Sequence, residues 1–297
     1  MSTAGDGGPK RGLWAAAVLK WGMHISAKDI ARDLELVRRG SPLVHNITNY
    51  VAMNLTANAL LAVGASPVMA HAPEEVEDMV DIAAALVINI GTLSGHWVEA
   101  MVKAAHRAKK KGIPIVVDPV GAGATPYRTR TILELIRAVP PAILRGNASE
   151  IMASAGGRAR TKGVDSAAAA GSALASAHQI SAKYDCVVCV SGETDHIVGK
   201  NRTAMIGNGH ALMAKVTGLG CTASALCGAF AAVDADHFTA AAAAMAVMGI
   251  AGEIAAERSA GPASLQVQFL DALHNLGGDE IERRLRLEEA PGPAGTA

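Results

Sequence analysis

The segment 215–225, with the sequence KVTGLGCTASA, carries the residues of this chain that are best suited to chemistry. Gly218 and Gly220 frame a tight turn, and small residues that favour a helix follow directly. A glycine turn that opens a helix leaves the first backbone N–H groups unpaired, and such groups bind phosphate well. Cys221 would lie at the positive end of that helix, where the pKa of a thiol is lowered. The segment predicts a phosphate-binding turn with a reactive thiol, although a small buried cysteine in a glycine-rich turn is an equally good interpretation.

The composition excludes several classes of protein. The 297 residues are 50% hydrophobic and 18% charged, with a formal net charge of +0, which is typical of a soluble globular chain. The one basic run, Lys109 to Lys111, ends an amphipathic stretch, and aromatic residues make up only 3% of the chain. We therefore expect no nucleic-acid partner. No continuous apolar run is long enough to span a membrane, so we expect no membrane partner either.

The four cysteines do not indicate an oxidising compartment. Cys186 and Cys189 have CxxC spacing but lie inside an apolar run that is typical of a strand. In a strand their side chains would point to opposite faces, which prevents a disulfide or a shared metal ion. We interpret them as structural residues and expect the protein to be cytoplasmic.

The chain alternates strand-like and helix-like segments. Continuous apolar runs predict strands at 42–45, 67–70, 85–90, 113–117, 142–144 and 186–190. Amphipathic patterns predict helices at 50–63, 74–83, 94–111, 128–138 and 166–183, and the chain after Cys221 is almost wholly helical, with 238–257 as its longest helix. Apolar strands that alternate with helices indicate an α/β fold, with a central, mostly parallel sheet covered by helices on both faces.

The ends of the chain differ from this pattern. Residues 1–23 predict a disordered or loosely helical extension, because their apolar run is short and is interrupted by Lys20. Residues 286–297 predict a disordered tail, because they are rich in proline, glycine and alanine. No composition break divides residues 24–285. We therefore expect a single α/β domain over that range.

Polar and glycine-rich residues follow nearly every predicted strand. In an open parallel sheet, ligands bind at the edge formed by the carboxyl ends of the strands, so these residues should meet there. Taken singly, residues such as Asn49 and Asn147 are well explained as helix caps. Their joint placement at one edge favours a binding site.

That edge has the side chains needed for phosphoryl transfer. Asp118 and Glu150 are suited to hold Mg²⁺, largely through water, because this ion keeps much of its hydration shell. Arg145 offers a planar cation for phosphate oxygens, and Cys221 is a candidate to take a proton from an attacking hydroxyl. The P-loop pattern GxxxxGK[ST] is absent, so a P-loop kinase is excluded.

Six motifs, in this order, closely resemble those of the hydroxyethylthiazole kinase family. They are SPLVHNITN at 41–49, GASPVM at 64–69, NIGTL at 89–93, DPVGAGA at 118–124, RGNASEI at 145–151 and KVTGLGC at 215–221. The resemblance runs from Ser41 to Ser264, which covers nearly all of the expected domain. It implies a ribokinase-like fold without a separate lid domain, and the transfer of the ATP γ-phosphate to 5-(2-hydroxyethyl)-4-methylthiazole in thiamine biosynthesis or salvage.

The resemblance also implies roles for single residues. Met69, Gly218 and Asn49 would bind the thiazole, with Asn49 near a subunit interface of a homotrimer, and Arg145 and Ser191 would contact ATP. A further set of roles concerns catalysis: Asp118 and Glu150 would organise Mg²⁺, and Cys221 stands where many ribokinase-like relatives carry an aspartate base.

Two alternatives remain at this stage. Another ribokinase-like kinase, such as one for hydroxymethylpyrimidine, would share the fold, and an aspartate in place of Cys221 would have favoured it. A metabolite-binding relative without catalysis would not need Asp118, Arg145, Glu150 and Cys221 together, and this chain has all four.

Overall fold

A single nine-stranded sheet forms the centre of the computed structural model, which describes residues 24–157 and 166–292. The strands are β1 (Leu43–Ile47), β2 (Ser66–Val68), β3 (Ala85–Asn89), β4 (Ile115–Asp118), β5 (Ile143–Asn147), β6 (Val187–Ser191), β7 (Asp195–Val198), β8 (Arg202–Ile206) and β9 (Leu287–Pro291). Their order across the sheet is β2-β1-β3-β4-β5-β6-β7-β8-β9. Pairs from β2 to β6 are parallel and pairs from β6 to β9 are antiparallel.

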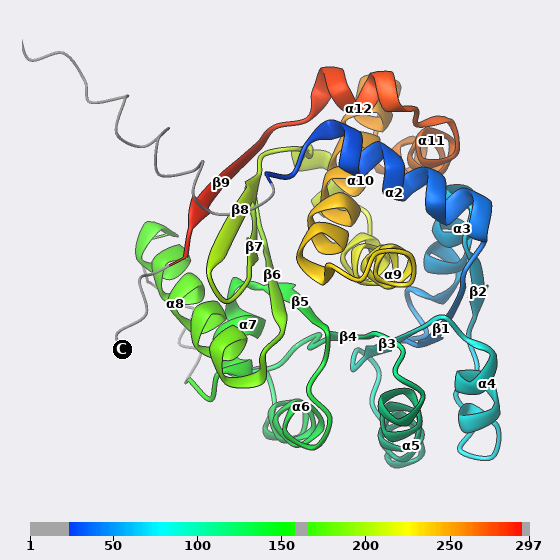
Figure 1. The fold of residues 1–297 in the computed structure, drawn as a ribbon, viewed down its shortest axis with the longest axis vertical. Coiled ribbons are helices and arrows are strands. Elements are labelled where there is room, and N and C mark those ends of the chain that lie inside the picture. Colours follow the sequence, from blue (N-terminus) through cyan, green and yellow to red (C-terminus); the bar gives the residue numbers. More distant parts are fainter. Residues whose placement is uncertain (1–23, 158–165, 293–297) are drawn as a thin grey trace, which may run out of the picture.

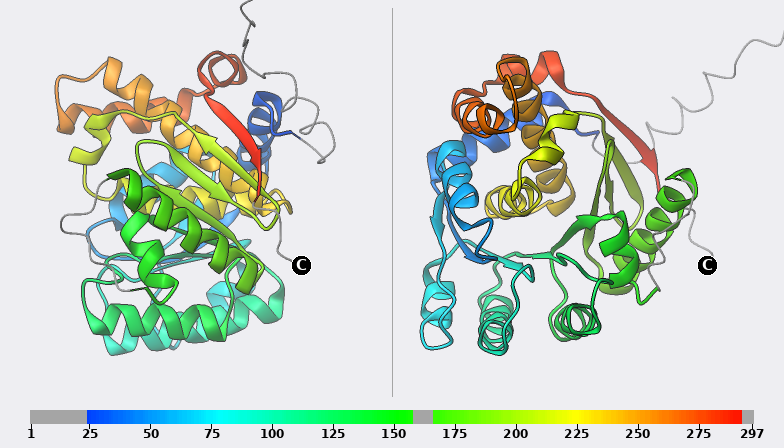
Figure 2. Two further views of the ribbon diagram at one scale, coloured as in Figure 1. Left: turned by 90° about the vertical axis from the view of Figure 1, so that its left-hand side faces the viewer. Right: turned by 180° about the vertical axis from the view of Figure 1, so that it is seen from behind.

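Helices cover both faces of this sheet, as the sequence predicts (Figure 1). They are α2 (Ala27–Gly40), α3 (Met53–Val63), α4 (Val76–Ile82), α5 (Gly95–Lys111), α6 (Pro126–Ala138), α7 (Ala148–Ser154), α8 (Ser166–Tyr184), η1 (Ala211–Lys215), α9 (Leu219–Ala231), α10 (His237–Glu257), α11 (Pro262–Asn275) and α12 (Gly278–Arg284). One core cluster joins the sheet to α2, α3, α9, α10 and α11, and a second joins it to α4 to α8. Figure 2 shows the two helical layers from the side and from behind.

The six predicted strands are all present as β1 to β6, with ends shifted by a few residues. The strands β7, β8 and β9 were not predicted, because they are short and mix polar with apolar residues. Antiparallel backbone pairing holds these strands in the sheet, and Ile197, Ala204 and Ile206 also pack in the core. Within the described ranges, β7 to β9 extend the main sheet and form no separate lid.

The structure corrects the expected C-terminal tail in part. Residues 287–291 form the edge strand β9, which pairs with β8, instead of being disordered. Residues 293–297 of the expected tail and residues 1–23 of the expected extension lie outside the described residues. At the start of the described chain, Glu289 on β9 accepts hydrogen bonds from the backbone N–H of Ile25 at 2.6 Å and pairs with His24 at 2.9 Å.

The alanine-rich helix α10 is the centre of the larger core cluster. By length and composition it could cross a membrane, which differs from the sequence expectation that no such run exists. However, 94% of its most apolar window is buried inside the protein. A helix that is apolar on all sides must be covered on all sides, and here the neighbouring helices and the sheet do this.

Cys189 lies in β6, as predicted, whereas Cys186 lies directly before the first residue of that strand. Cys186 belongs to the core cluster on one face of the sheet and Cys189 to the cluster on the other face. Both are free thiols. The CxxC pattern therefore reflects packing in the core clusters on opposite faces of the sheet.

Candidate active site

The carboxyl ends of the parallel strands bring the predicted site residues to one edge of the sheet. The register of the sheet sets Asn89, at the end of β3, beside Asp118, at the end of β4. In the same way it sets Asn147, at the end of β5, beside Ser191, at the end of β6. Because each strand runs in an apolar core up to its last residues, the first polar side chains emerge together at this edge.

The glycine turn before α9 has the predicted form. Gly218 is the N-cap of α9, with a φ of 86° that favours glycine, and the first helical hydrogen bond runs from Thr222 N–H to the Gly218 carbonyl at 2.9 Å. The N–H groups of residues 219–221 thus have no partner within the helix. They form a donor cluster at the positive end of a 13-residue helix, which is suited to a phosphate.

Cys221 lies in the first turn of α9, and its Sγ accepts a hydrogen bond from Nδ2 of Asn49 at 3.2 Å. The sequence predicts a lowered thiol pKa here, and the structure shows the opposite. Burial raises the pKa of the Cys221 thiol, and the nearby carboxylate of Asp118 raises it further. Asn49, Asn89 and Arg145 lower the pKa, but they do not compensate for burial. The prediction of a polarised thiol is therefore wrong, because the desolvation of the Cys221 side chain outweighs the groups that favour the thiolate.

Arg145 lies between the glycine turn and Ser191. Its Nη2 donates a hydrogen bond to Ser191 Oγ at 2.8 Å, and Ser191 Oγ in turn donates to the Gly146 carbonyl at 3.2 Å. Burial lowers the pKa of the guanidinium, but the carboxylates of Asp118 and Asp195 outweigh burial and hold that pKa above its ordinary value. Arg145 is thus a fixed cation, and its buried Nε has no partner among the described residues.

Asp118 is buried in the centre of the site. Its Oδ2 accepts hydrogen bonds from Asn89 Nδ2 at 2.8 Å and from Ser224 Oγ at 2.7 Å. Its Oδ1 is buried without a partner in the described part of the chain. Burial raises the pKa of Asp118 to about 6, although Arg145 opposes this shift. A buried acceptor with a free oxygen is well suited to bind a cation or the water around one.

Glu150 caps the start of α7 and also contacts a neighbouring loop. It forms a capping box with Asn147, whose side chain accepts from the Glu150 N–H at 3.0 Å while Glu150 Oε2 accepts from the Asn147 N–H at 2.9 Å. Its Oε1 accepts from the Gly121 N–H at 2.9 Å, which ties the loop after β4 to α7. Both oxygens keep a second lone pair, so Glu150 can still accept from water.

The carboxylates fit Mg²⁺ better through water than by direct ligation. Among the described residues no group of three or more His, Cys, Asp or Glu side chains could hold a metal ion. Mg²⁺ in kinases is usually held by one or two carboxylates, several waters and the substrate phosphates. The free Oδ1 of Asp118 and the partly used carboxylate of Glu150 match that requirement.

A cavity of about 900 Å³ opens beside Arg145 and Ser191. Its walls come from the loop after β8, the start of α9 and the middle of α10, and include His210, Met248 and Arg286, which were not predicted from the sequence. The only signal for them was the glycine-rich segment 207–209 after a strand that the sequence itself did not reveal. The size of the cavity and its cation are suited to a nucleotide.

Met69 and Asn49 lie outside the walls of this cavity. Met69 follows β2 and is half-buried, and Asn49 follows the neighbouring β1 and is buried. Gly218 does not line the cavity either, and a Cβ atom there would lie 3.4 Å from Ala52. Of the eight predicted site residues, Arg145 and Ser191 line the cavity, and Cys221 lies next to Asn49.

Comparison with known proteins shows the family of this chain. Residues 34–279 match the model of the hydroxyethylthiazole kinase family. Hydroxyethylthiazole kinases from Syntrophus aciditrophicus and Leptospira biflexa are each 58% identical, over 89% and 87% of this chain and 98% and 97% of theirs.

Solved structures show the same fold. The structure of a hydroxyethylthiazole kinase protein from Pyrococcus horikoshii is 43% identical, covers 89% of this chain and 99% of its own, and has a TM-score of 0.82. A pyridoxal kinase from Staphylococcus aureus shares only 16% identity but has a TM-score of 0.62 over 84% of this chain. A ribokinase-like superfamily protein from Enterococcus faecalis, 12% identical with a TM-score of 0.60, agrees with the predicted fold class.

Proposed function

The chain belongs to the hydroxyethylthiazole kinase family, and we propose that it transfers the γ-phosphate of ATP to the hydroxyl group of 5-(2-hydroxyethyl)-4-methylthiazole. The observation that carries this proposal is the position of Cys221 in the first turn of α9. There it accepts a hydrogen bond from Asn49, and the adjacent Gly220 lines the cavity together with Arg145. A phosphate on one side and an alcohol on the other would meet at the N-terminus of α9.

On the phosphate side of the site, a fixed cation and backbone N–H donors are already positioned to bind phosphate oxygens. Arg145 and the N–H groups of residues 219–221 would bind the transferred phosphoryl group, with Ser191 holding the guanidinium in its orientation. Such donors stabilise charge that develops in the transition state and need no reorganisation. Asp118 and Glu150 would hold Mg²⁺ through water, and the ion would neutralise charge on the phosphates.

The acceptor side would place the alcohol. We propose that Met69 and the Gly218 backbone contact the thiazole ring, and that Cys221 Sγ takes the hydroxyl proton as the new P–O bond forms. Because burial raises the pKa of this thiol, the thiolate is scarce at neutral pH. Phosphoryl transfer through a loose transition state needs proton removal only late, so a small thiolate fraction is compatible with turnover.

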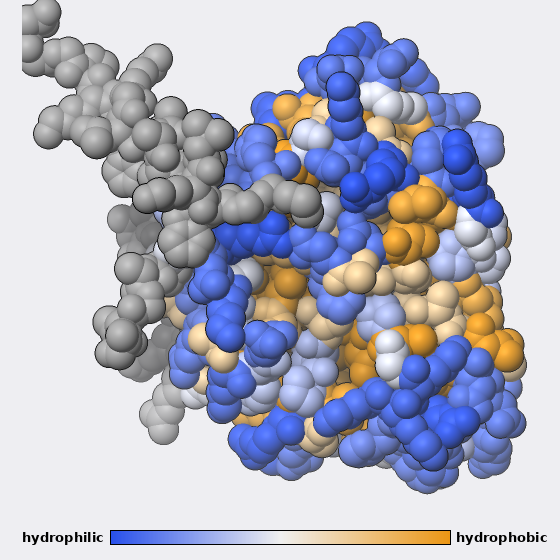
Figure 3. Space-filling model, in the orientation of Figure 1, coloured by the Kyte–Doolittle hydropathy of each residue, from blue (hydrophilic) through white to orange (hydrophobic). Residues whose placement is uncertain are grey.

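We propose a homotrimer in the cytoplasm as the working form. Tyr50 and Val51 follow Asn49 directly and are each 64% exposed, and Leu61 on α3 is 59% exposed. Figure 3 shows apolar surface on the side of the molecule where α3 and β2 lie. Large exposed apolar side chains next to a site are typical of a subunit contact. Light scattering at micromolar concentration should give three times the chain mass of 30.3 kDa, and a monomer mass would contradict the proposal.

An ADP-release assay tests the proposed reaction. The protein with ATP and Mg²⁺ should release ADP when 5-(2-hydroxyethyl)-4-methylthiazole is present, and much less with hydroxymethylpyrimidine or with no acceptor. Faster release with the pyrimidine would support a different ribokinase-like kinase. ATP binding without ADP release for either alcohol would indicate a relative that has lost catalysis.

A further inference from the structure

Hydrogen bonds join Cys221 to Asp118 through two amide side chains that are almost fully buried. Asn49 Nδ2 donates to Cys221 Sγ at 3.2 Å and also to Asn89 Oδ1 at 2.9 Å. Asn89 Nδ2 then donates to Asp118 Oδ2 at 2.8 Å. Asn89 is 1% exposed and Asn49 is 5% exposed. Asn89 is thus a buried amide between the two groups and is not one of the predicted site residues.

Backbone groups fix the direction of this chain of hydrogen bonds. The Gly91 N–H donates to Asn89 Oδ1 at 2.9 Å, and the Ala52 N–H donates to Asn49 Oδ1 at 3.1 Å. A backbone N–H can only donate, so each amide must turn its oxygen toward that N–H and its NH₂ group the other way. The NH₂ group of Asn49 therefore faces the sulfur, and the NH₂ group of Asn89 faces the carboxylate.

Packing keeps Asn49 in this orientation. A Cβ atom at Gly91 would lie 2.7 Å from the Asn49 side chain, so the glycine allows Asn49 to fit closely against the backbone. Without Asn89, one N–H of Asn49 would be buried without an acceptor, and the amide could then turn or draw in water. Asn89 is thus the acceptor that fixes the Asn49 amide.

We propose that Asn89 is a positioning residue for phosphoryl transfer, which acts by holding the Asn49 N–H against Cys221 Sγ. The donor occupies one side of the sulfur and leaves the other side for the proton of the acceptor hydroxyl. An N–H donor also favours the thiolate over the thiol. This inference rests on the proposed function of Cys221 as the proton acceptor.

A double-mutant cycle tests whether Asn89 acts through Cys221. Asn89→Leu replaces the amide by an apolar side chain of similar size, and kcat for ADP release should fall about tenfold, the effect of one lost hydrogen bond. The KM for ATP should not change, because the hydrogen bonds of Asn89 among the described residues run to Asn49, Gly91 and Asp118 and not to Arg145 or Ser191. In a Cys221→Ala background, Asn89→Leu should lower kcat by less than about twofold, since residues that act as a unit are not additive.

The alkylation rate of Cys221 is a second readout that does not need turnover. The other three cysteines are buried, so iodoacetamide should react first with Cys221 in the folded protein. Asn89→Leu should slow this reaction, because the sulfur loses the orientation of its N–H donor. Val87→Ala is the matched control: it removes buried apolar atoms two residues earlier on β3 without touching the amides, and it should leave both kcat and the alkylation rate unchanged.

The possible results separate the two proposals. If Asn89→Leu lowers kcat equally in both backgrounds, or leaves kcat and alkylation unchanged, the positioning role is wrong. If Cys221→Ala alone is as active as the wild type, the proposed function of Cys221 fails, and the alkylation rate still decides whether Asn89 orients the donor. Should Asn89→Leu not fold, Asn89→Ser, which is smaller and keeps a hydroxyl, takes its place in every measurement with the same expected outcomes.

Discussion

Arg145 passes so close to Gly220 that a Cβ atom at Gly220 would lie 3.0 Å from Nη1. This is tighter than most real Cβ contacts, so a side chain at position 220 must move the guanidinium. The contact explains why the turn needs its second glycine even though Gly220 lies in the first turn of α9. The first glycine supports the backbone turn, and the second makes room for the cation.

Gly220→Ala should therefore weaken ATP binding without harming the fold. Alanine suits a helix, so the thermal stability should not fall, but the displaced Arg145 should raise the KM for ATP by about tenfold, as for the loss of one hydrogen bond to a charged group. Steady-state kinetics with varied ATP would measure this. The control is Gly171→Ala in α8, where an added Cβ meets nothing within 4 Å. An unchanged KM in Gly220→Ala would contradict the predicted displacement of Arg145.

Glu150→Gln tests the proposed Mg²⁺ role. The neutral amide would lower kcat at least on the order of tenfold and shift the Mg²⁺ dependence to higher concentration. Asn147→Ala separates this from the capping role, because it removes the α7 cap at a cost of about 1 kcal/mol in stability but keeps the carboxylate. Turnover measured against Mg²⁺ concentration should change only in Glu150→Gln. Wild-type turnover in that variant would leave Glu150 as a helix cap alone.

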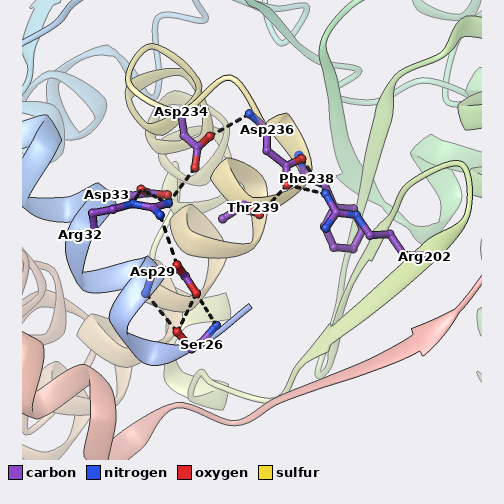
Figure 4. A network of polar contacts seen from close by, with 9 residues as sticks. All are labelled: Ser26, Asp29, Arg32, Asp33, Arg202, Asp234, Asp236, Phe238 and Thr239. Carbon is purple, nitrogen blue, oxygen red and sulfur yellow. Dashed lines mark hydrogen bonds and ion pairs between the residues drawn. The ribbon is translucent and has the colours of Figure 1, made fainter. Parts of the chain in front are cut away.

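Asp33 predicts a pH dependence of stability. It lies in the polar network between α2 and the start of α10, where Arg32 bridges it to Asp234 (Figure 4). Burial raises the pKa of Asp33 from 3.8 to about 6, although the hydrogen bond from Arg32 opposes this. The folded protein thus keeps a proton that the unfolded chain has already lost in the window between these values. The free energy of unfolding should fall as the pH rises through that window.

Asp33→Asn should reduce this fall by up to about 3 kcal/mol. Asp118 and Asp195 have raised pKa values as well, so some slope should remain. Urea unfolding at several pH values would measure it. Asp29→Asn is a suitable control, because a hydrogen bond from Ser26 lowers the pKa of Asp29, and its contribution is lost as the pH falls. Identical pH profiles for Asp33→Asn and the wild type would refute the prediction.

Deleting residues 1–23 should leave activity and oligomeric state unchanged. The described chain is already anchored after that point, by the contacts of His24 and Ile25 with Glu289. A longer deletion of residues 1–26 would remove those contacts and the Ser26 cap of α2, and it should lower the melting temperature. Loss of activity or of the oligomer in the shorter deletion would show that the extension belongs to the folded domain.

The sequence predicts the parallel half of the sheet well because its strands are buried on both faces and therefore continuously apolar. It does not predict β9, whose sequence LEEAP is stabilised by pairing with β8 rather than by burial. The edge that gathers Asp118, Arg145 and Ser191 follows from the strand pattern alone. The cavity walls formed by residues 207–211 were not predicted, because they follow β8, which the sequence did not reveal.

Other properties of the site depend on three-dimensional contacts that sequence spacing does not show. The thiol pKa of Cys221 was predicted from its place at a helix N-terminus, but burial decides its direction. Asn89 stood inside a matched motif, yet its function depends on the register of β3 with β4 and on the Gly91 N–H.

Turnover of Cys221 variants tests the central claim most directly. Cys221→Ala should lower kcat by on the order of 10²- to 10⁴-fold with an unchanged KM for ATP, because general base catalysis is lost while the binding groups remain. Cys221→Asp should keep much more activity, since a carboxylate at a helix N-terminus is ionised at neutral pH. Wild-type activity in Cys221→Ala would contradict the account, and so would a folded, ATP-binding Cys221→Asp protein without turnover.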